Sequence, residues 1–245
     1  MPPKGRSKSS PRVLVVAPAY NESGKIGAVV RDVLRQPCVD AMVVVDDCSS
    51  DATGDEASEA GATVLRHAQN RGAGAALRTG IQYGVDEGFD IVAIVSGDGQ
   101  HVADELERVV RPVADGSCDL CQASRFADGG NVRGQNAFRT SLIRFYSLVF
   151  TVFTGTALSD ATNGMRAFRT SLLAEAGIDL DQGWLDRYEL EPYLLYRAAQ
   201  SDARMMERPC TVIYPEAGSY SHMRPFVDWW KLFRPLVFLR FGIKR

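Results

Sequence analysis

The chain reads RVLVVAPAYNES at residues 12–23, an apolar run that ends abruptly in polar and turn-forming residues. The same arrangement recurs in MVVVDD at residues 42–47 and in IVAIVSGDGQ at residues 91–100. Short apolar runs bounded by turn residues indicate strands buried on both faces, as in a parallel sheet covered by helices. Helical patterns lie between them, at about residues 25–35 and 73–87. The sequence therefore predicts an α/β fold with a mostly parallel sheet and helices on both faces.

Composition and charge limit the classes to which the protein can belong. The chain has 245 residues, of which 45% are hydrophobic and 24% charged, which suits one large globular domain. A net charge of -2 argues against a nucleic-acid-binding protein. The charge is uneven, because residues 1–12 carry cations and no acid, and residues 223–245 carry cations against Asp228 alone. Either end is suited to contact with an anionic surface.

Three regions follow from these patterns: a disordered basic arm at 1–10, the α/β domain at 11–222, and a basic, aromatic tail at 223–245. The arm has no apolar core of a secretory signal, and 5 cysteines form an odd, sparse set typical of a reducing compartment. The expected location is therefore cytoplasmic. The tail suits the headgroup region on the cytoplasmic face of a membrane, and the alternatives are packing against the domain or in a homo-oligomer.

Polar residues follow three of the expected strands, at Pro18–Glu22, Asp46–Asp51 and Ser96–His101. In parallel sheets, ligands bind beyond the carboxyl ends of the strands. Carboxylates gathered at one edge repel one another, and hard oxygen ligands favour Mg²⁺ or Mn²⁺. Glycines on both sides of Asp98 allow a bulky diphosphate to approach the backbone. One such turn alone would be an ordinary polar loop, whereas three together predict a binding site.

Six motifs in a fixed order carry a more specific signal: PAYNE, VVVDDCSSDAT, NRGAGAAL, SGDGQH, ASRFADGG and DATNGMRAF. With them the chain resembles a family 2 glycosyltransferase of the GT-A fold, in particular the dolichol- or polyprenyl-phosphate hexose synthases. The resemblance implies a Rossmann-like sheet and an inverting enzyme that moves a hexose from a UDP- or GDP-sugar to an acceptor, foremost a polyprenyl phosphate.

The resemblance also implies a donor site. It assigns to the nucleotide sugar Pro18, Tyr20, Glu22, Asp47, Arg71, Gly72 and Asp98. Asp98 and Gln100 match ligands of Mg²⁺ or Mn²⁺ and of the diphosphate, which makes Asp98 a catalytic residue as well. The chain departs from the family at Ser96, where the usual Asp-x-Asp motif has an acid. One negative charge is therefore missing from the expected metal site.

The second half is expected to hold the acceptor. The resemblance places Arg125 and Arg139 on the acceptor phosphate, a role that guanidinium geometry suits, and the alternative is solvated surface arginines. The uncharged stretch Phe145–Leu158 would be about 21 Å long as a helix, too short for about 30 Å of hydrocarbon. It would line a lipid groove or pack in the core. Asp160 is the candidate catalytic base for a hydroxyl acceptor, whereas a phosphate acceptor is already ionised.

Other readings remain open. An NAD-linked oxidoreductase is disfavoured because the first strand leads into APAYNE and not into a glycine-rich turn. A non-catalytic sugar-nucleotide-binding protein stays open because of Ser96. His67 is expected at the surface or at a helix entry, and His101 lacks the paired spacing of a metal ligand.

Overall fold

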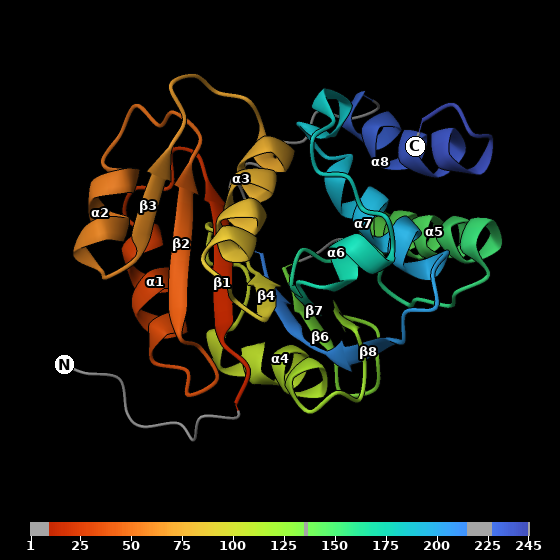
Figure 1. The fold of residues 1–245 in the computed structure, drawn as a ribbon, viewed down its shortest axis with the longest axis horizontal. Coiled ribbons are helices and arrows are strands. Elements are labelled where there is room, and N and C mark those ends of the chain that lie inside the picture. Colours follow the sequence, from red (N-terminus) through yellow and green to blue (C-terminus); the bar gives the residue numbers. More distant parts are fainter. Residues whose placement is uncertain (1–9, 135–136, 215–226, 245) are drawn as a thin grey trace.

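The structure is a computed structural model that describes residues 10–134, 137–214 and 227–244 (Figure 1). The expected arm lies outside these residues apart from Ser10, and so does the expected boundary between domain and tail at residue 222. The helices are α1 (Ile26–Leu34), α2 (Thr53–Glu59), α3 (Ala73–Asp86), α4 (Leu106–Ala114), α5 (Ala137–Thr154), α6 (Leu172–Glu175), α7 (Leu190–Ala199) and α8 (Val227–Arg240). Figure 1 shows α5, α7 and α8 grouped at one end of the molecule, opposite α1 and α2.

A seven-stranded sheet forms the centre, in the order β3-β2-β1-β4-β7-β5-β8. Its strands are β1 (Val13–Ala19), β2 (Ala41–Asp46), β3 (Thr63–Arg66), β4 (Ile91–Ile94), β5 (Leu120–Ser124), β7 (Arg166–Arg169) and β8 (Met205–Pro209). Strand β7 runs antiparallel to β4 and β5, and the remaining pairs are parallel. The predicted α/β class with a mostly parallel sheet is confirmed. Strand β7 was not predicted, because a four-residue segment with an arginine at each end lacks the pattern of a buried strand.

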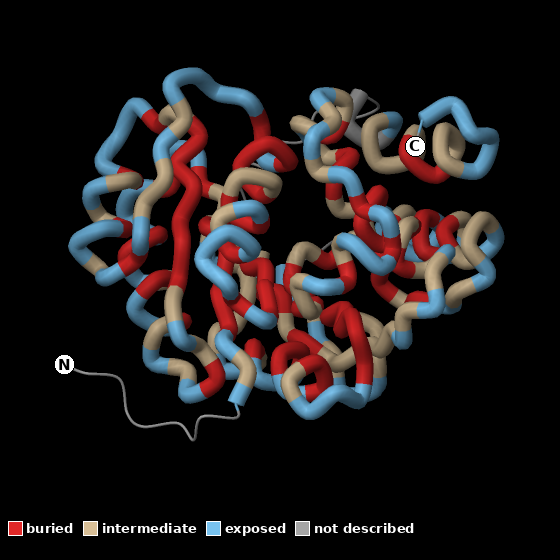
Figure 2. Tube along the Cα trace, in the orientation of Figure 1, coloured by how far each residue is buried: buried red, intermediate tan, exposed pale blue. Residues whose placement is uncertain are grey.

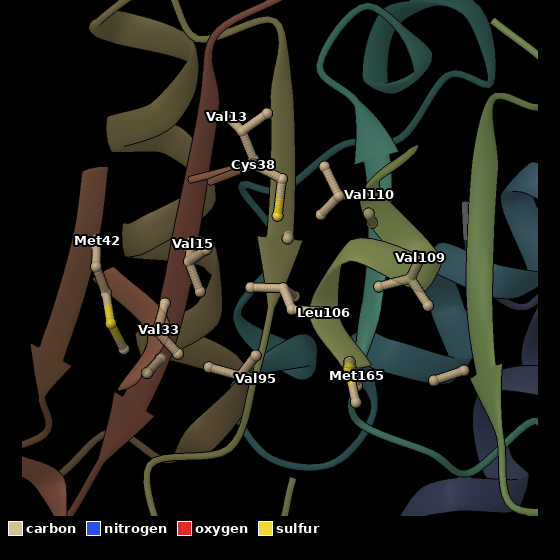
Figure 3. Close-up of a cluster of buried hydrophobic side chains, with 14 of the residues drawn as sticks. Val13, Val15, Val33, Cys38, Met42, Val95, Leu106, Val109, Val110 and Met165 are labelled. Atoms are coloured by element: carbon tan, nitrogen blue, oxygen red, sulfur yellow. The ribbon is translucent and has the colours of Figure 1, made fainter. Parts of the chain in front are cut away.

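Both faces of the sheet are covered, because successive strand side chains point to opposite sides. From β1, Val13 and Val15 enter a core cluster with residues of α1 and α4, part of which is drawn in Figure 3. Leu14 and Val16 enter a second cluster with residues of α3, α5 and α7. Figure 2 shows β1 and the strands beside it as largely buried. The uniformly apolar runs in the sequence reflect this two-sided burial.

Helix α3 lies unusually close to the sheet. A Cβ atom added at Gly80 would lie 2.3 Å from Cγ1 of Val16, so a larger residue does not fit there without displacement of the strand. This close contact positions the start of α3 over the carboxyl edge of the sheet. It also positions the loop that precedes α3, residues 70–72, which we call the NRG loop.

The described part of the tail is α8, and it packs against the domain. Leu236 is 0% exposed, and the Tyr146 hydroxyl donates a hydrogen bond of 3.2 Å to the carbonyl of Leu232. Arg234 points inward and lies 2.5 Å from the carboxylate of the buried Glu189. Trp230 on the same helix is exposed. The tail is thus a docked helix with an outer surface, and among the described residues no helix is long and apolar enough to cross a membrane.

Candidate active site

The three polar segments predicted to form a site do meet at one edge of the sheet. The ends of β1 and β2 are paired in register, with Ala19 opposite Asp46. A Cβ atom at Gly97 would lie 2.8 Å from the carbonyl oxygen of Pro18, so the loop after β4 touches the end of β1. Strands β2 and β4 lie on opposite sides of β1, so the strand order reverses at β1. Open α/β sheets bind ligands at such a reversal.

Hydrogen bonds join the loops after β1 and β2. The Asn21 amide donates to Oγ of Ser49 at 3.0 Å, and the Ser50 amide donates to Oδ1 of Asn21 at 2.9 Å. Asn21 has a φ of 55°, a left-handed conformation that asparagine tolerates. Tyr20 is 40% exposed at this edge, while Glu22 is buried and its carboxylate lies 3.0 Å from Lys25. Of Tyr20 and Glu22, Tyr20 therefore presents the larger exposed surface to a ligand.

Asp47 holds the NRG loop in place. Its carboxylate accepts hydrogen bonds from the backbone amides of Arg71 at 2.9 Å and Gly72 at 2.6 Å. His67 contributes a third contact, with Nδ1 2.7 Å from Oδ1 of Asp47, and its Nε2 lies 2.9 Å from Oγ1 of Thr79. The expectation that His67 lies at the surface or at a helix entry was therefore wrong, because its side chain is 8% exposed and the residue directly follows β3. Asp47 therefore holds the expected nucleotide loop through the backbone amides of that loop. The side chain of Arg71 is left exposed.

The segment after β4 carries the expected metal ligands. Gln100 donates to the Asp98 carboxylate through its backbone amide at 3.1 Å and through Nε2 at 2.7 Å. Among the described residues, no group of three or more His, Cys, Asp or Glu side chains could enclose a metal ion. One carboxylate and one amide oxygen nevertheless fit Mg²⁺ or Mn²⁺, which commonly takes its remaining ligands from phosphates and water. The expected donor set fits an ion shared with a diphosphate.

A cavity of about 670 Å³ lies beside Asp98 on the side of α1. Its lining includes Lys25, Ser96, Asp98 and His101. The expected nucleotide residues Tyr20, Asp47 and Arg71 are not part of it. The cavity is therefore distinct from the loop edge to which the resemblance assigns the nucleotide.

In the second half, Arg125 and Asp160 form a buried ion pair. Nε and Nη2 of Arg125 donate to Oδ2 and Oδ1 of Asp160, both at 2.6 Å, and Asp160 is 0% exposed. Nη2 also donates to Oγ1 of Thr162 at 2.8 Å. Burial alone would lower the pKa of Arg125, but the hydrogen bonds and charge of Asp160 hold it above its ordinary value. Asp160 is fully occupied as an anchor for Arg125 in this structure.

Tyr214 brings the two predicted acceptor arginines together. Its hydroxyl accepts a hydrogen bond of 2.6 Å from Nη1 of Arg125, and the guanidinium of Arg139 lies 4.5 Å from the centroid of its ring. Arg125 is buried, whereas Arg139 is partly exposed. Sequence reasoning did not single out Tyr214, because nothing in the local pattern around a tyrosine after a short strand indicates such contacts.

His101 connects the two halves. Nδ1 of His101 lies 3.1 Å from both the amide nitrogen and Oγ of Ser96, and Nε2 lies 3.2 Å from Oδ1 of Asn163. Burial, with a smaller contribution from the positive Arg125, lowers the pKa of His101 to about 4, against opposing effects of Asp98, Asn163 and Asp160. The ring is thus neutral near pH 7.

Comparison with solved structures identifies the class of fold. The structure of glucosyl-3-phosphoglycerate synthase from Mycobacterium tuberculosis, determined with Mn²⁺, UDP and phosphoglyceric acid, matches with a TM-score of 0.67. The match covers 97% of this chain and 81% of that chain, at 20% sequence identity. The fold is therefore that of the GT-A glycosyltransferases.

Sequence comparison identifies the family. Residues 14–177 match the family described as glycosyl transferase family 2. The chain is 31% identical over 215 residues to an undecaprenyl-phosphate mannosyltransferase of Micrococcus luteus, covering 84% of this chain and 86% of that one. It is 30% identical over 213 residues to a polyprenol monophosphomannose synthase of Mycolicibacterium smegmatis, covering 84% and 79%. The chain belongs to glycosyltransferase family 2.

The ion pair makes a testable prediction about stability. Arg125→Ala leaves the Asp160 carboxylate buried without its partner, which should lower the free energy of unfolding by about 3–5 kcal/mol. Arg139→Ala is the matched control, because it removes a partly exposed cation–π contact worth about 1 kcal/mol or less. Urea unfolding of both variants measures the difference. Equal losses in the two variants would contradict the anchoring role assigned to the pair.

Proposed function

We propose that this glycosyltransferase moves a hexose from a UDP- or GDP-sugar to a polyprenyl phosphate, with inversion at the anomeric carbon. The observation that carries the proposal is the Arg125–Asp160 pair. The pair engages Asp160, the candidate base, in a bidentate contact, and it brings Arg125 to Tyr214, whose ring also contacts Arg139. A phosphate monoester is mostly dianionic near pH 7, so it needs positioning and no base. The relatives named for undecaprenyl phosphate and polyprenol support this acceptor class.

On the donor side, the loops after β1, β2 and β4 supply the contacts. The nucleotide would lie on Pro18, Tyr20 and Glu22 and against the loop that Asp47 holds at Arg71 and Gly72. Asp98 and Gln100 would hold Mg²⁺ or Mn²⁺, which when bound neutralises charge on the diphosphate leaving group. The Mn²⁺ in the structural relative supports this choice of ion.

On the acceptor side, Arg139 and the Arg125–Tyr214 pair would hold the phosphate facing the anomeric carbon. A phosphate oxygen forms the new C–O bond while the bond from carbon to the diphosphate oxygen breaks, and its electron pair leaves with the nucleoside diphosphate. Four of the five N–H donors of Arg125 are already engaged, so Arg125 alone has too few donors for a phosphate, and Arg139 is assigned to the phosphate as well.

A hydroxyl acceptor with Asp160 as the base is the second candidate. The structure disfavours it, because proton uptake by Asp160 would have to weaken a buried, bidentate ion pair. A soluble acceptor of this kind would also leave the outer face of α5 without a role.

That face carries large apolar side chains. Phe138, Phe145, Leu148 and Val152 are exposed, with Phe138 at 77% and Val152 at 73%. Their spacing places them on one side of α5, and the stripe begins next to Arg139. The ring of Phe145 lies 6.2 Å from that of Phe233 on α8, which links the stripe to the docked tail. This face would contact the membrane that holds a polyprenyl acceptor.

The metal assignment predicts that Asp98→Ala lowers kcat by about 10²-fold or more, because a charge-stabilising group is lost from the transition state. Asp104→Ala is the control, since Asp104 is an exposed acid on the same segment. Release of UDP or GDP from a panel of sugar donors measures turnover. Full activity of Asp98→Ala, or of the wild type in EDTA, would contradict the assignment.

The acceptor assignment predicts that Arg139→Ala raises KM for polyprenyl phosphate about tenfold or more, because a hydrogen bond to a charged group contributes about 1.5–3 kcal/mol. KM for the nucleotide sugar should hardly change. Arg133→Ala, which removes an exposed arginine of β6 (Asn131–Arg133), is the control. Transfer to polyprenol at a rate similar to that of polyprenyl phosphate would favour the hydroxyl acceptor.

The membrane assignment predicts that the protein sediments with anionic phospholipid vesicles and that high salt weakens this binding. Leu148→Glu should reduce the vesicle-bound fraction by about tenfold, because it loses at least about 1.5 kcal/mol of apolar burial. Val85→Glu changes an exposed apolar residue on α3 and is the control. Wild-type protein that stays in the supernatant at low salt would contradict the assignment.

A further inference from the structure

A chain of hydrogen bonds crosses from the donor side to the acceptor side of the site. It consists of Ser96, His101, Asn163, Asp160 and Arg125, and we call it the cross-site chain. His101 is the link between Ser96 and Asn163, and within the described part of the chain its side chain makes no hydrogen bond to the expected nucleotide loop or to Tyr214. Neither the family match nor the expected ligand set accounts for this residue.

The direction of the bonds at His101 follows from its neighbours. The Ser96 amide can only donate, so Nδ1 of His101 must accept and carries no proton. The hydroxyl of Ser96 then donates to the same nitrogen. In a neutral ring the proton is on Nε2, which donates to Oδ1 of Asn163. The amide and hydroxyl of Ser96 thus both favour the tautomer protonated at Nε2, whereas an ionised carboxylate side chain at this position could only accept a hydrogen bond and would favour a proton on Nδ1.

Asn163 is oriented independently of His101. Its Oδ1 accepts a hydrogen bond of 2.9 Å from the Met165 amide, which fixes which side of the amide faces His101. Its Nδ2 lies 3.1 Å from Sγ of Cys210 and 3.5 Å from Oδ2 of Asp160. Asn163 is 2% exposed. The acceptor end of the bond from His101 is therefore rigid.

The backbone holds the same region by other means. The Ile213 amide donates to the carbonyl of Gln100 at 3.0 Å, and His101 pairs with Val212 in an antiparallel bridge. These bonds do not involve the imidazole. A change of the His101 side chain should therefore leave the path of the segment intact and alter only how firmly it is joined to Asn163.

We propose that His101 is a positioning residue that sets the placement of Asp98 and Gln100 relative to the Arg125–Asp160 pair, by bridging Ser96 to Asn163. The proposal rests on the proposed transfer between a donor at Asp98 and an acceptor at Arg125. In such a reaction the nucleophile and the anomeric carbon are held by different halves of the chain. A misplacement of about 1 Å between them can cost about 10²-fold in rate.

Kinetics of His101 and Asn163 variants test the proposal. His101→Ala should lower kcat by about 10- to 100-fold with a smaller change in KM for the nucleotide sugar, since most of the expected nucleotide contacts lie on the loops after β1, β2 and β3. His101→Gln places an amide donor near the position of Nε2 and should restore much of kcat. Tyr146→Phe removes a buried hydrogen bond outside the cross-site chain and is the control for general loss of stability.

A double-mutant cycle separates positioning from a merely structural role. If His101 and Asn163 act through their shared bond, His101→Ala with Asn163→Ala should lose no more in kcat than the worse single variant. Additive losses, or wild-type kcat in folded His101→Ala, would overturn the proposal. Thermal unfolding of each variant confirms that folded protein is compared.

Two further measurements keep this inference separate from the proposed function. Heteronuclear NMR of the imidazole nitrogens in metal-free protein should show His101 protonated at Nε2, and protonation at Nδ1 would overturn the bridge. Wild-type transfer to polyprenyl phosphate is measured first. If the wild type transfers sugar and the His101 variants match it, the inference fails alone. If the wild type transfers nothing, the proposed function fails while the NMR result still decides the bridge.

Discussion

The buried ion pair between Arg125 and Asp160 is the interaction on which the arrangement of the site depends. Arg125 follows β5 and Asp160 lies in the turn before β7, so the pair joins two segments that are far apart in the sequence. Two charges removed from water are costly unless their geometry and remaining hydrogen bonds are good. Here Thr162 and Tyr214 occupy further donors of Arg125. The pair therefore fixes where the second half of the chain meets the sheet.

Strand direction explains why the two halves share one edge. The parallel strands β1, β2 and β4 end at the edge that carries Tyr20, Asp47 and Asp98. Strand β7 is antiparallel to β4, so β7 begins at the same edge and the segment that precedes β7 ends there. Asp160 and Asn163 thereby come beside the loops that carry Tyr20, Asp47 and Asp98. A parallel strand at this place would have carried them to the opposite edge of the sheet.

Much of the fold could be predicted, because its signals are local. The runs VLVVA and IVAIV are apolar throughout since they are buried on both faces, and Gly97 and Gly72 mark close approaches of the backbone. His67 was misjudged, because its burial depends on Asp47 and Thr79, which lie in other elements. The tail was ambiguous for a similar reason. Leu236 faces the core and Trp230 faces outward on the same helix. Both are large apolar residues, so the composition of the tail does not show which of them is buried.

The sequence by itself determined the class of fold, the edge at which the three polar loops meet, and the family, because the order of the motifs and the apolar character of the buried strands can be read from the sequence. Only the tertiary structure decided the roles of Arg125 and Asp160. The sequence suggested a phosphate contact for Arg125 and a catalytic base for Asp160, whereas in the structure the two side chains form an ion pair. The same holds for Tyr214 as the meeting point of two arginines and for His101 as a bridge to Asn163. Such pairings depend on distances between segments dozens of residues apart, and no local pattern encodes those distances.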